Sequence, residues 1–415
     1  MSEPADSEIS EPKKARAAVG AGSARRGRRA EQIARAAGYL FQTQGYQNVS
    51  IDQIGAAVGL TGPAVYRHFK GKHDILVSAL MRQVRVVEEL GERMDTAETA
   101  ARPRLDLYLA GLGDLTANQD EATLWRREQR HLEPTQQQWF RHHYTTVHDR
   151  IAGYIANARP EISAYQARLL GYAVLTMYSN TGDIRGGLAA PRLLEIQTAV
   201  ATAMVDCDLP EPAADARSAP QLIHHRPAGR RERILAAAVG LFEERGFYDV
   251  RIDDIASAAE ISVATLYQHV TGKAEVLRAI LDRGAEGLLY VTADALAHTT
   301  TPQQTLDALI RSYTRQALGI HGPIMRILAA DLIYLDTAEQ SALRDTQRDY
   351  VAEWVQAILA LSGTSTAEDA RALAHAAIGV LTDISQHPEL RARPGIFEEL
   401  AVLGRAITQP PLLRR

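Results

Sequence analysis

Cysteine is almost absent from this chain of 415 residues, which contains only Cys207. An intrachain disulfide needs two cysteines and a thiolate zinc site needs several, so both are excluded. Such low cysteine usage is typical of proteins that fold in a reducing compartment, and we expect this chain in the cytoplasm.

Long apolar runs are also missing. The most apolar stretch, Leu169–Tyr178, has about half of the ~20 residues that a membrane-spanning helix needs, so we expect no membrane partner. The first residues are polar and basic, without the apolar core of a secretory signal. With 46% hydrophobic and 23% charged residues, the composition is that of a globular protein, and the length predicts two or three domains.

Positive charge is not in excess overall, since the net charge is −4, but it is concentrated in two places. Residues 1–29 carry seven basic and four acidic residues, and a second basic cluster follows at Arg226, Arg230, Arg231 and Arg233. Basic arms often contact nucleic acid. Flexible termini are also basic for solubility, so this feature alone leaves both interpretations open.

The most informative feature is an internal repeat. Residues 29–77 align with residues 230–278 without a gap, at a constant offset of 201, and 18 of the 49 aligned positions are identical. The chain therefore consists of two similar halves, which we call half one (1–206) and half two (228–415). The segment between them, Asp206–Gly229, contains four prolines and no amphipathic period, which is typical of a linker.

Each repeat predicts a helix-turn-helix. In half one, a first helix with an apolar face ends at Gly45, and Ser50 with Gln53 predicts a capping box for a short second helix. Gly59 then supplies a sharp turn, and Thr61 caps a third short helix. The apolar face of the first helix consists of Ile33, Ala37, Leu40 and Phe41.

In such a motif the third helix reads base edges in the major groove while basic residues contact phosphates. The alternative is a purely structural helical hairpin. Two copies of the motif, each next to basic residues, disfavour this alternative. The expected DNA contacts of half one are Arg25, Arg26, Arg28, Arg29, Ser50, Thr61, Gly62, Pro63, Ala64, Tyr66, Arg67, His68 and Lys72. Those of half two are Arg230, Arg231, Arg251, Ser262, Val263, Ala264, Thr265, Tyr267, Gln268, His269 and Lys273.

The run from Ile51 to Gly59, followed by Tyr66-Arg67-His68-Phe69 and Gly71-Lys72, resembles the N-terminal domain of TetR-family transcriptional regulators, and half two contains a second copy. The resemblance implies an all-α fold of two tandem units, each a helix-turn-helix DNA-binding domain followed by a helical ligand-binding and dimerisation domain. The segments expected are a flexible basic arm (1–24), a first head (25–77), a first regulatory region (78–205), a linker (206–227), a second head (228–278) and a second regulatory region (279–408).

The second head departs from the pattern at several positions. Arg251 replaces Ser50, so we expect the helix cap to be lost, at a cost of ~1 kcal/mol. Glu260 stands where Gly59 makes the turn, which is costly if the position needs a positive φ. Gln268 and Thr271 replace two basic residues. The second head should therefore be less stable and less electrostatic, while still binding DNA.

The regulatory regions are predicted to be helical throughout, with breaks at prolines. The resemblance implies a small-molecule pocket in such a region and a four-helix interface between the halves. Candidate pocket residues are Trp125, Tyr144, Tyr172, Met177, Tyr178, Tyr313, Met325, Tyr334 and Trp354. Ordinary core packing is the more common use of aromatic residues at helical spacing, and it is the alternative for each of them.

No enzymatic function is expected, because the chain contains no P-loop, dinucleotide-binding fingerprint, Gly-x-Ser-x-Gly elbow or His-Glu-x-x-His motif. We also expect no cofactor and no metal, since His142, His143 and His148 lack a ligand spacing. The predicted function is a DNA-binding regulator, a repressor released by a small effector, with lipid-like molecules among the candidates. The alternatives are an activator, or a helical small-molecule-binding module with structural repeats.

The predicted partners are a double-stranded DNA operator and the unidentified effector. Two unequal heads in one chain further predict a monomer that acts as an intramolecular pseudo-dimer on an asymmetric operator, because identical heads would demand a palindrome. Two chains sharing a longer operator stay possible on this argument.

Overall fold

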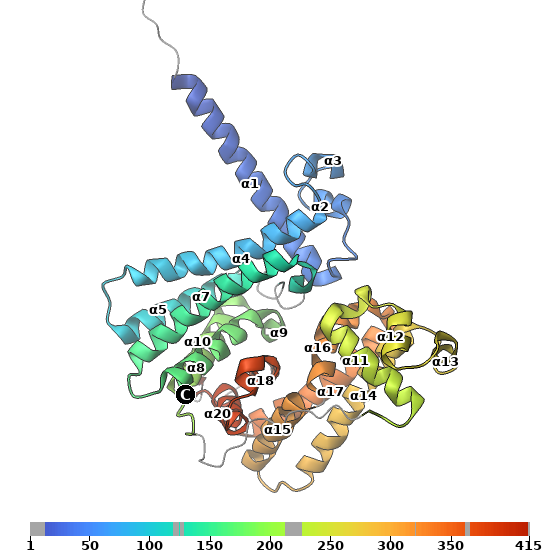
Figure 1. Ribbon diagram of the computed structural model, residues 1–415. Coiled ribbons are helices and arrows are strands. Elements are labelled where there is room, and N and C mark those ends of the chain that lie inside the picture. The colour runs from blue at the N-terminus through green and yellow to red at the C-terminus, as the bar shows by residue number, and fades with distance from the viewer. Residues whose placement is uncertain are drawn as a thin grey trace, which may run out of the picture. The chain divides into compact units, whose positions relative to one another are not determined.

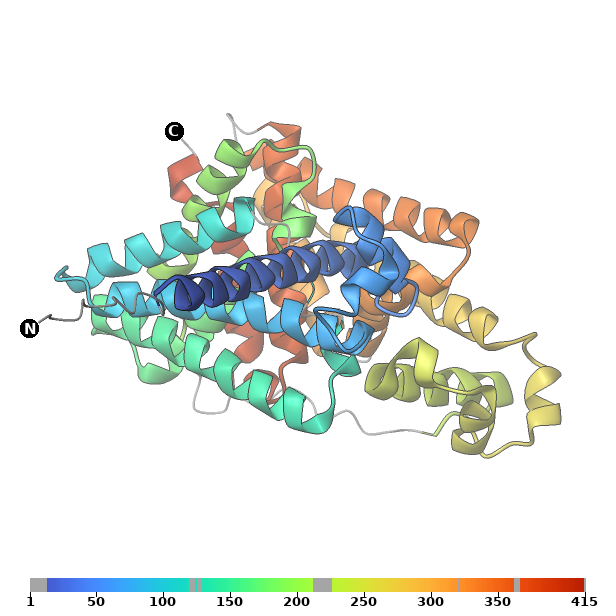
Figure 2. The same cartoon turned by 90° about the horizontal axis from the view of Figure 1, so that it is seen from above.

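In a computed structural model, the chain is described over residues 13–118, 124, 128–211, 226–319, 321–361 and 366–413, and the regular elements there are all helical (Figures 1 and 2). Side chains are described for these residues except 13–26, 130 and 412. The chain divides into two compact units, one ending at Gln83 and the other beginning at Val84, and each is described by itself.

The first unit contains the first head. Its helices are α1 (Lys13–Gln44), α2 (Ile51–Ala57), α3 (Gly62–Val65) and the beginning of α4 (Lys72–Asp95). Ile33, Ala37 and Phe41 are fully buried, which confirms most of the predicted apolar face of α1. Gly45 follows α1 with φ +82°, as expected of a glycine that ends a helix. Helix α1 includes residues 13–24 of the segment predicted as an arm, and residues 1–12 lie outside the described part.

The rest of half one forms the first part of the second unit. Helix α5 (Ala101–Asn118) is followed by the short 3-10 helix η1 (Gln129–His131) and by α7 (Pro134–Ala158), α8 (Ala164–Ser179), α9 (Thr181–Arg185) and α10 (Ala190–Asp206). Prolines occupy the first or second position of α7 and α10, where a missing N–H costs no helical hydrogen bond.

Half two repeats this order. The second head consists of α11 (Arg230–Asp249), α12 (Ile252–Ala258), α13 (Val263–Tyr267) and the start of α14 (Lys273–Leu296). Helix α11 is interrupted at Gly246, whose φ of 78° matches that of Gly45. The remaining elements are α15 (Pro302–Leu318), α16 (Gly322–Asp331), η2 (Leu332–Tyr334), α17 (Thr337–Leu361), α18 (Ala367–Gln386), α19 (Pro388–Arg391), α20 (Ile396–Thr408) and η3 (Pro411–Leu413).

The two halves meet in a four-helix bundle. Helices α8 and α10 of half one pack against α18 and α20 of half two, as the green and red ribbons show (Figures 1 and 2). One continuous apolar core contains residues of both halves, such as Leu170, Val200, Val380 and Leu403. The second head has a separate apolar core built around Phe242, Leu266 and Leu277. This second core also includes Ile327, Leu332 and Leu343 of the second regulatory region, so the second head packs directly against α16, η2 and α17.

The length and apolar character of the described helices bear on membrane insertion. Among these helices, no single one is long and apolar enough to cross a membrane. Pro302–Leu318 and Gly322–Tyr334 reach that length and composition only together, across a bend of 87°.

Four partly buried histidines predict a loss of stability in mild acid. Burial lowers the pKa of His148, His321, His375 and His387 below the ordinary value, because the charged imidazolium is poorly solvated there. The unfolded chain gains these protons below pH ~6.5, whereas the fold resists them. The melting temperature should therefore be level above pH ~6.5 and fall between that pH and the lowered pKa values.

Thermal melts between pH 7.5 and 5 test this prediction. The variant His148→Gln should show a shallower decline, because glutamine can still donate to the Arg168 carbonyl that His148 Nε2 contacts at 2.9 Å. The exposed His298 provides the matched control, and His298→Gln should leave the decline unchanged. A melting temperature independent of pH in the wild-type protein would contradict the prediction.

Candidate nucleic-acid interface

The first head forms the predicted helix-turn-helix. Ser50 Oγ accepts from Gln53 N at 3.2 Å, and Gln53 Oε1 accepts from Ser50 N at 2.7 Å, which confirms the capping box. Gly59 has φ +67° and makes the turn between α2 and α3. Thr61 is the residue before α3, as predicted, but its side chain makes no capping hydrogen bond. Residues close together in the sequence therefore determine the cap of α2 and the turn that positions α3.

The outer face of α3 carries side chains that can meet DNA. Tyr66 is 58% exposed, and Thr61, Pro63 and Arg67 are exposed as well. Ala64 and His68 are half-buried. Val65 and Phe69 are buried, which confirms that they face inward. The exposed residues are part of the set predicted to contact DNA, and those contacts stay a prediction.

Gly62 was expected to contact DNA, but it does not lie on the exposed face of α3. The residue is buried, and a Cβ atom at this position would lie only 2.0 Å from Asp52 Oδ1. The absence of a side chain is therefore explained by the packing of α3 against α2. Its predicted DNA contact could only involve the backbone.

Lys72 and Lys273 have a structural function that the sequence argument did not include. Lys72 Nζ donates to the carbonyls of Tyr46 at 3.0 Å and Gln47 at 3.3 Å, and lies 4.6 Å from the centre of the Tyr46 ring. Lys273 Nζ donates to the carbonyls of Phe247 and Val250, both at 2.6 Å. Each ammonium thus stabilises the chain just after the first helix of its head. Phosphate contact by these lysines stays a prediction.

Among the basic residues at the start of the first head, one also makes a structural contact. Arg29 donates from one nitrogen to the Val58 carbonyl at 3.0 Å, which connects α1 to the end of α2. Arg28 is exposed. Arg25 and Arg26 lie on α1, but their side chains fall outside the described part. Arg230 and Arg231 are exposed in the second head.

The second head keeps part of the cap that was expected to be lost. Asp254 Oδ2 accepts from Arg251 N at 2.8 Å, so half of the capping box survives although Arg251 has replaced the serine. Ser262 Oγ accepts from Thr265 N at 3.1 Å and caps α13. The expected loss is therefore smaller than a missing cap, because the acidic residue at the third helical position supplies an acceptor.

The outer face of α13 resembles that of α3. Tyr267 is 52% exposed, Ala264 and Gln268 are exposed, and His269 is half-buried. Val263 and Thr265 are half-buried, and Val263 packs against the apolar core of the second head. Val263 therefore contributes mainly to packing, at the position where half one has Gly62.

Glu260 adopts φ +54°, and it is the one non-glycine residue with positive φ among the described residues. The suspected positive φ at this turn is thus confirmed. Glu260 also pairs with Arg226 across the surface of the head. Because both partners are exposed, this pair stabilises the head by at most ~1 kcal/mol.

We expect Glu260→Gly to stabilise the second head. Glycine removes the ~1 kcal/mol steric cost of the left-handed conformation, and the lost surface pair offsets only part of the gain. Urea unfolding of the full chain measures the effect. Glu260→Ala is the matched control, since it loses the same pair and keeps the steric cost. Equal stability of the two variants would contradict the explanation.

The two heads differ strongly in charge, which sequence comparison could have revealed if carried through every position. Over the aligned windows, residues 27–83 contain seven basic and three acidic residues, a net of +4. Residues 228–284 contain eight basic and nine acidic residues, a net of −1. On the helix-turn-helix surface itself, Asp254 and Glu260 replace Gln53 and Gly59. The difference in net charge between the two heads is therefore larger than the loss of two basic residues alone predicts.

A buried carboxylate is one of the contacts between the second head and its regulatory region. Asp331, at the end of α16, is fully buried, and its Oδ2 accepts from Phe247 N at 3.1 Å. Tyr334 stacks on the Phe247 ring with a centroid distance of 5.5 Å. In the regulatory regions the offset between the halves is 203, since α7 begins at Pro134 and α17 at Thr337, so Glu128 is the equivalent of Asp331, and it is buried too. Sequence reasoning missed these residues, although comparing the halves beyond residue 77 would have aligned them.

The predicted ligand residues occupy different environments. Met177, Tyr178, Tyr313 and Trp354 are buried in the core, whereas Tyr144, Tyr172, Met325 and Tyr334 are half-buried. Tyr178 Oη donates to the Leu109 carbonyl at 2.8 Å, and Tyr334 belongs to the core of the second head. Trp125 lies outside the described residues. For most of this set, core packing is the observed use, and ligand contact stays a prediction.

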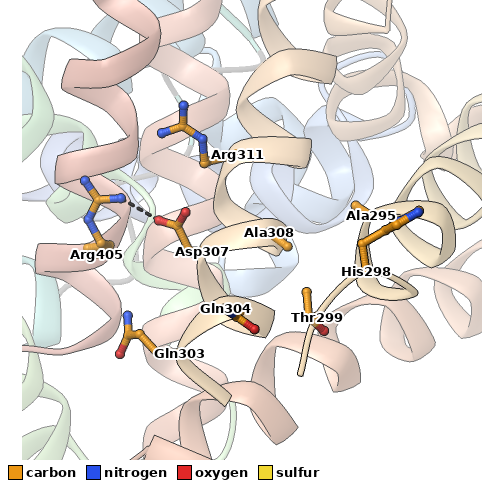
Figure 3. Close-up of a pocket in the computed structure, with 9 residues that line it drawn as sticks. All are labelled: Ala295, His298, Thr299, Gln303, Gln304, Asp307, Ala308, Arg311 and Arg405. Carbon is orange, nitrogen blue, oxygen red and sulfur yellow. Dashed lines mark hydrogen bonds and ion pairs between the residues drawn. The ribbon is translucent and has the colours of Figure 1, made fainter. Parts of the chain in front are cut away.

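A shallow pocket of about 540 Å³ opens elsewhere, between α14, α15 and α20 (Figure 3). Its charged residues include Asp307 and Arg405, which form an ion pair across it. No predicted ligand residue within the described part lines this pocket. Within the same part, no group of three His, Cys, Asp or Glu side chains is placed to hold a metal.

The sequence comparisons agree with this geometry. Residues 33–79 and 234–280 each match the bacterial regulatory proteins of the tetR family. Over 84 residues the chain is 36% identical to the HTH-type transcriptional activator FasR of Mycolicibacterium smegmatis, a match that spans 20% of this chain and only 38% of FasR.

Solved structures give weaker likenesses. A TetR-family transcriptional regulator from Bordetella parapertussis is 20% identical, with a TM-score of 0.40, over 45% of this chain and 95% of its own. The ketosteroid transcriptional regulator KstR2 of Mycobacterium tuberculosis is 24% identical, with a TM-score of 0.31, over 32% of this chain and 68% of its own.

Two helix-turn-helix motifs with capped second helices and exposed third helices have the geometry with which such motifs enter the major groove of DNA. The two family matches coincide with these motifs, so residues 33–79 and 234–280 are two tetR-family helix-turn-helix segments in one chain.

Proposed function

We propose that one chain acts as an intramolecular pseudo-dimer that regulates transcription from an asymmetric operator. The observation that supports it is the four-helix bundle of α8, α10, α18 and α20, which joins both halves of a single chain in one apolar core. Each half contributes one head, so a second chain is not needed to supply two heads. Tethering also favours internal pairing, since it gives the partner an effective concentration of roughly millimolar.

The two heads should recognise different half-sites. Arg67 in the first head corresponds to Gln268 in the second, and both are exposed. Arginine favours guanine and glutamine favours adenine in the major groove. A non-palindromic operator is therefore the expected target.

Light scattering of the free protein and a footprint on the DNA upstream of its own gene test this proposal. The expected results are the mass of one chain and two unequal protected half-sites. A stable dimer of chains on a perfect palindrome, with only first heads engaged, would overturn it. A protein that shows no salt-dependent binding to DNA would instead be the helical small-molecule-binding module with structural repeats.

The four arginines at the start of the first head, Arg25, Arg26, Arg28 and Arg29, should carry much of the salt dependence of DNA binding. Replacing Arg25, Arg26, Arg28 and Arg29 by alanine should flatten the slope of log affinity against log salt by up to ~0.9 for each phosphate that is no longer neutralised. Because Arg29 also holds the end of α2, Arg28→Ala is made as a second variant; Arg28 is exposed, and no hydrogen bond of its side chain is found among the described residues. Titrations over a range of salt concentrations measure the slope, and an unchanged slope in both variants would show that these arginines do not bind DNA.

We further propose repression released by a small effector in the cytoplasm. The presence of two helix-turn-helix segments in one chain, together with the segment Leu124–Glu128, resembles the tandem TetR-type repressor of a mycobacterial mammalian-cell-entry operon. This resemblance favours repression. The matched relative FasR is named an activator, and this supports activation as the second candidate. A reporter under the upstream promoter, with and without the regulator gene, separates the two.

The interior of the second regulatory region is the site we favour for the effector. Thr292 Oγ1, Ser312 Oγ, Tyr350 Oη and Trp354 Nε1 are buried there; Tyr350 interacts with Thr292 and Trp354, but none of the four atoms makes a hydrogen bond of good geometry among the described residues. Buried polar atoms without well-placed partners are costly, so a ligand with hydrogen-bonding groups would be stabilised by them. This favours an effector that has polar groups over a purely hydrocarbon one.

A further inference from the structure

The bundle between the halves is held by polar contacts that are not symmetrical. Equivalent positions in the two regulatory regions differ by 203: α7 and α17 span 134–158 and 337–361, and the helix caps Ser163 and Thr366 correspond. In a two-fold symmetric interface each contact between two positions would occur twice. The polar contacts of this bundle can therefore be compared with those that a pair of identical halves would make.

The first contact joins two equivalent positions that are occupied by different residues. Asn180 is fully buried, and its Nδ2 donates to Asp383 Oδ2 at 3.2 Å. Because 180 and 383 differ by 203, these two residues meet where a two-fold axis would pass. A pair of first halves would place two Asn180 amides there, which can still bond. A pair of second halves would place two Asp383 carboxylates there, which repel each other.

The neighbouring position selects against a pair of first halves. Gly379 faces Asn180 so closely that a Cβ atom on Gly379 would lie 2.9 Å from Asn180 Cγ. The equivalent of Gly379 in half one is Thr176, which has a branched side chain. Two first halves would therefore force Thr176 against Asn180. The asparagine has no free rotation to avoid this, since its amide also donates to the Thr176 carbonyl of its own helix at 2.8 Å.

A bidentate ion pair provides the second asymmetric contact. Arg192 of half one donates to both oxygens of Asp369 in half two, at 3.0 and 2.8 Å, and Asp369 is buried. Hydrogen bonding to Arg192 lowers the pKa of Asp369, which keeps it ionised. The equivalents of these residues are Gly395 and Gln166, neither of which is charged. A pair of second halves would thus bury Asp369 twice without a cation, at a large cost.

The equivalent location on the other side of the bundle has a different contact. Arg393 of half two donates to the Tyr165 carbonyl of half one at 2.8 Å, and its guanidinium lies 3.4 Å from the centre of the Tyr165 ring. Glu399 holds the same guanidinium within half two through two buried hydrogen bonds. The equivalents of Arg393 and Tyr165 are Ala190 and Glu368, which cannot reproduce this contact.

We propose that this face accepts only the opposite half as its partner: half one pairs with half two, within a chain or by exchange between two chains, and neither half pairs with a copy of itself. Asn180 with Gly379, and Arg192 with Asp369, are the residues that determine this specificity. The inference deepens the proposed pseudo-dimer. Its test measures pairing without DNA, so its failure is distinguishable from a failure of operator binding.

Charge reversal in full-length chains tests the proposal. In Arg192→Glu, a glutamate faces Asp369, and in Asp369→Arg, an arginine faces Arg192. Each variant alone should melt about 5–10 °C below the wild type, as expected when a buried pair becomes a like-charge pair. The double variant in one chain restores opposite charges, so it should recover most of the loss and serves as the folding control.

Mixing the two single variants gives the sharper result. When they are unfolded and refolded together, exchange of halves brings the introduced glutamate of one chain against the introduced arginine of the other. The same exchange brings together the unchanged Arg192 and Asp369 that the two chains still contain. Light scattering should then show a two-chain species that melts within a few degrees of the wild type. Each variant refolded alone should not form it.

Three outcomes would overturn the proposal. The single variants could melt as the wild type does, each could form a stable dimer on its own, or the mixture could fail to associate although the double variant is restored. If both single variants fail to fold, a second measurement decides. With Cys207 replaced by serine, Asn180→Cys and Asp383→Cys together should form a disulfide under oxidation, whereas covalent dimers formed by either cysteine variant alone would contradict it.

Discussion

Replacing Tyr66 by alanine should weaken operator binding by ~1–3 kcal/mol, roughly 5- to 150-fold, while leaving the melting temperature nearly unchanged. The side chain lies on α3, is 58% exposed and belongs to no apolar core, so its removal creates no cavity. The loss should therefore appear in DNA affinity rather than in folding. Fluorescence anisotropy with the footprinted operator and a thermal melt of the same preparation measure the two quantities.

Two further variants make this test specific. Tyr290 is 78% exposed on α14, outside the helix-turn-helix, and Tyr290→Ala should change neither quantity. Tyr267→Ala probes the second head, where the net charge of −1 predicts that a larger share of the affinity depends on base contacts than on phosphates. A large drop in melting temperature with unchanged affinity per folded molecule would instead assign Tyr66 a structural role.

Replacing Asp331 by alanine should destabilise the second head by ~2–3 kcal/mol, because it leaves the buried Phe247 N–H without its acceptor. The same carboxylate also acts on Lys273. Burial lowers the pKa of Lys273, and the nearby carboxylates of Asp249, Asp331 and Asp254 oppose this shift because they favour the charged ammonium. Loss of Asp331 therefore weakens both the attachment of the head and the lysine that holds the end of α11. Hydrogen exchange of the second head, compared with that of the bundle helices, measures the effect.

Asp331→Asn is the matched control, since the amide oxygen can still accept from Phe247 N. It should retain most of the stability and lose only the effect of the charge on Lys273. If the effector signal passes through this contact, Asp331→Ala should also reduce the effect of effector on DNA release. Equal protection of the head in the alanine variant and the wild type would show that other contacts hold it.

Features determined by a few neighbouring residues could be predicted from the sequence. The capping box of Ser50 and Gln53, the turn at Gly59 and the positive φ of Glu260 depend on residues within four positions of one another, and their preferences are strong. The internal repeat strengthened these predictions, because each motif occurred twice in the same order. The helical class of the fold and the exposed faces of α3 and α13 followed from the apolar period.

Contacts between distant residues could not be predicted in this way. The carbonyls that hold Lys72 lie 25 and 26 positions before it, and the oxygens that hold Arg192 lie 177 positions after it. A long basic side chain has the same local signature whether it contacts phosphate, a carbonyl or a carboxylate. For the same reason the burial of Gly62 against Asp52 was missed, and the aromatic residues proposed for the pocket were mostly found in cores.

The Asn180–Asp383 contact has a consequence for how such a protein can change over generations. In a symmetric dimer every substitution appears twice, at both ends of the operator and on both sides of the axis, so a small change in recognition must be tolerated in duplicate. Here a substitution appears once. Selection can therefore change the recognition of one half-site, or one regulatory region, while the other half preserves the original binding. The two half-sites of the operator can then change in sequence independently of each other.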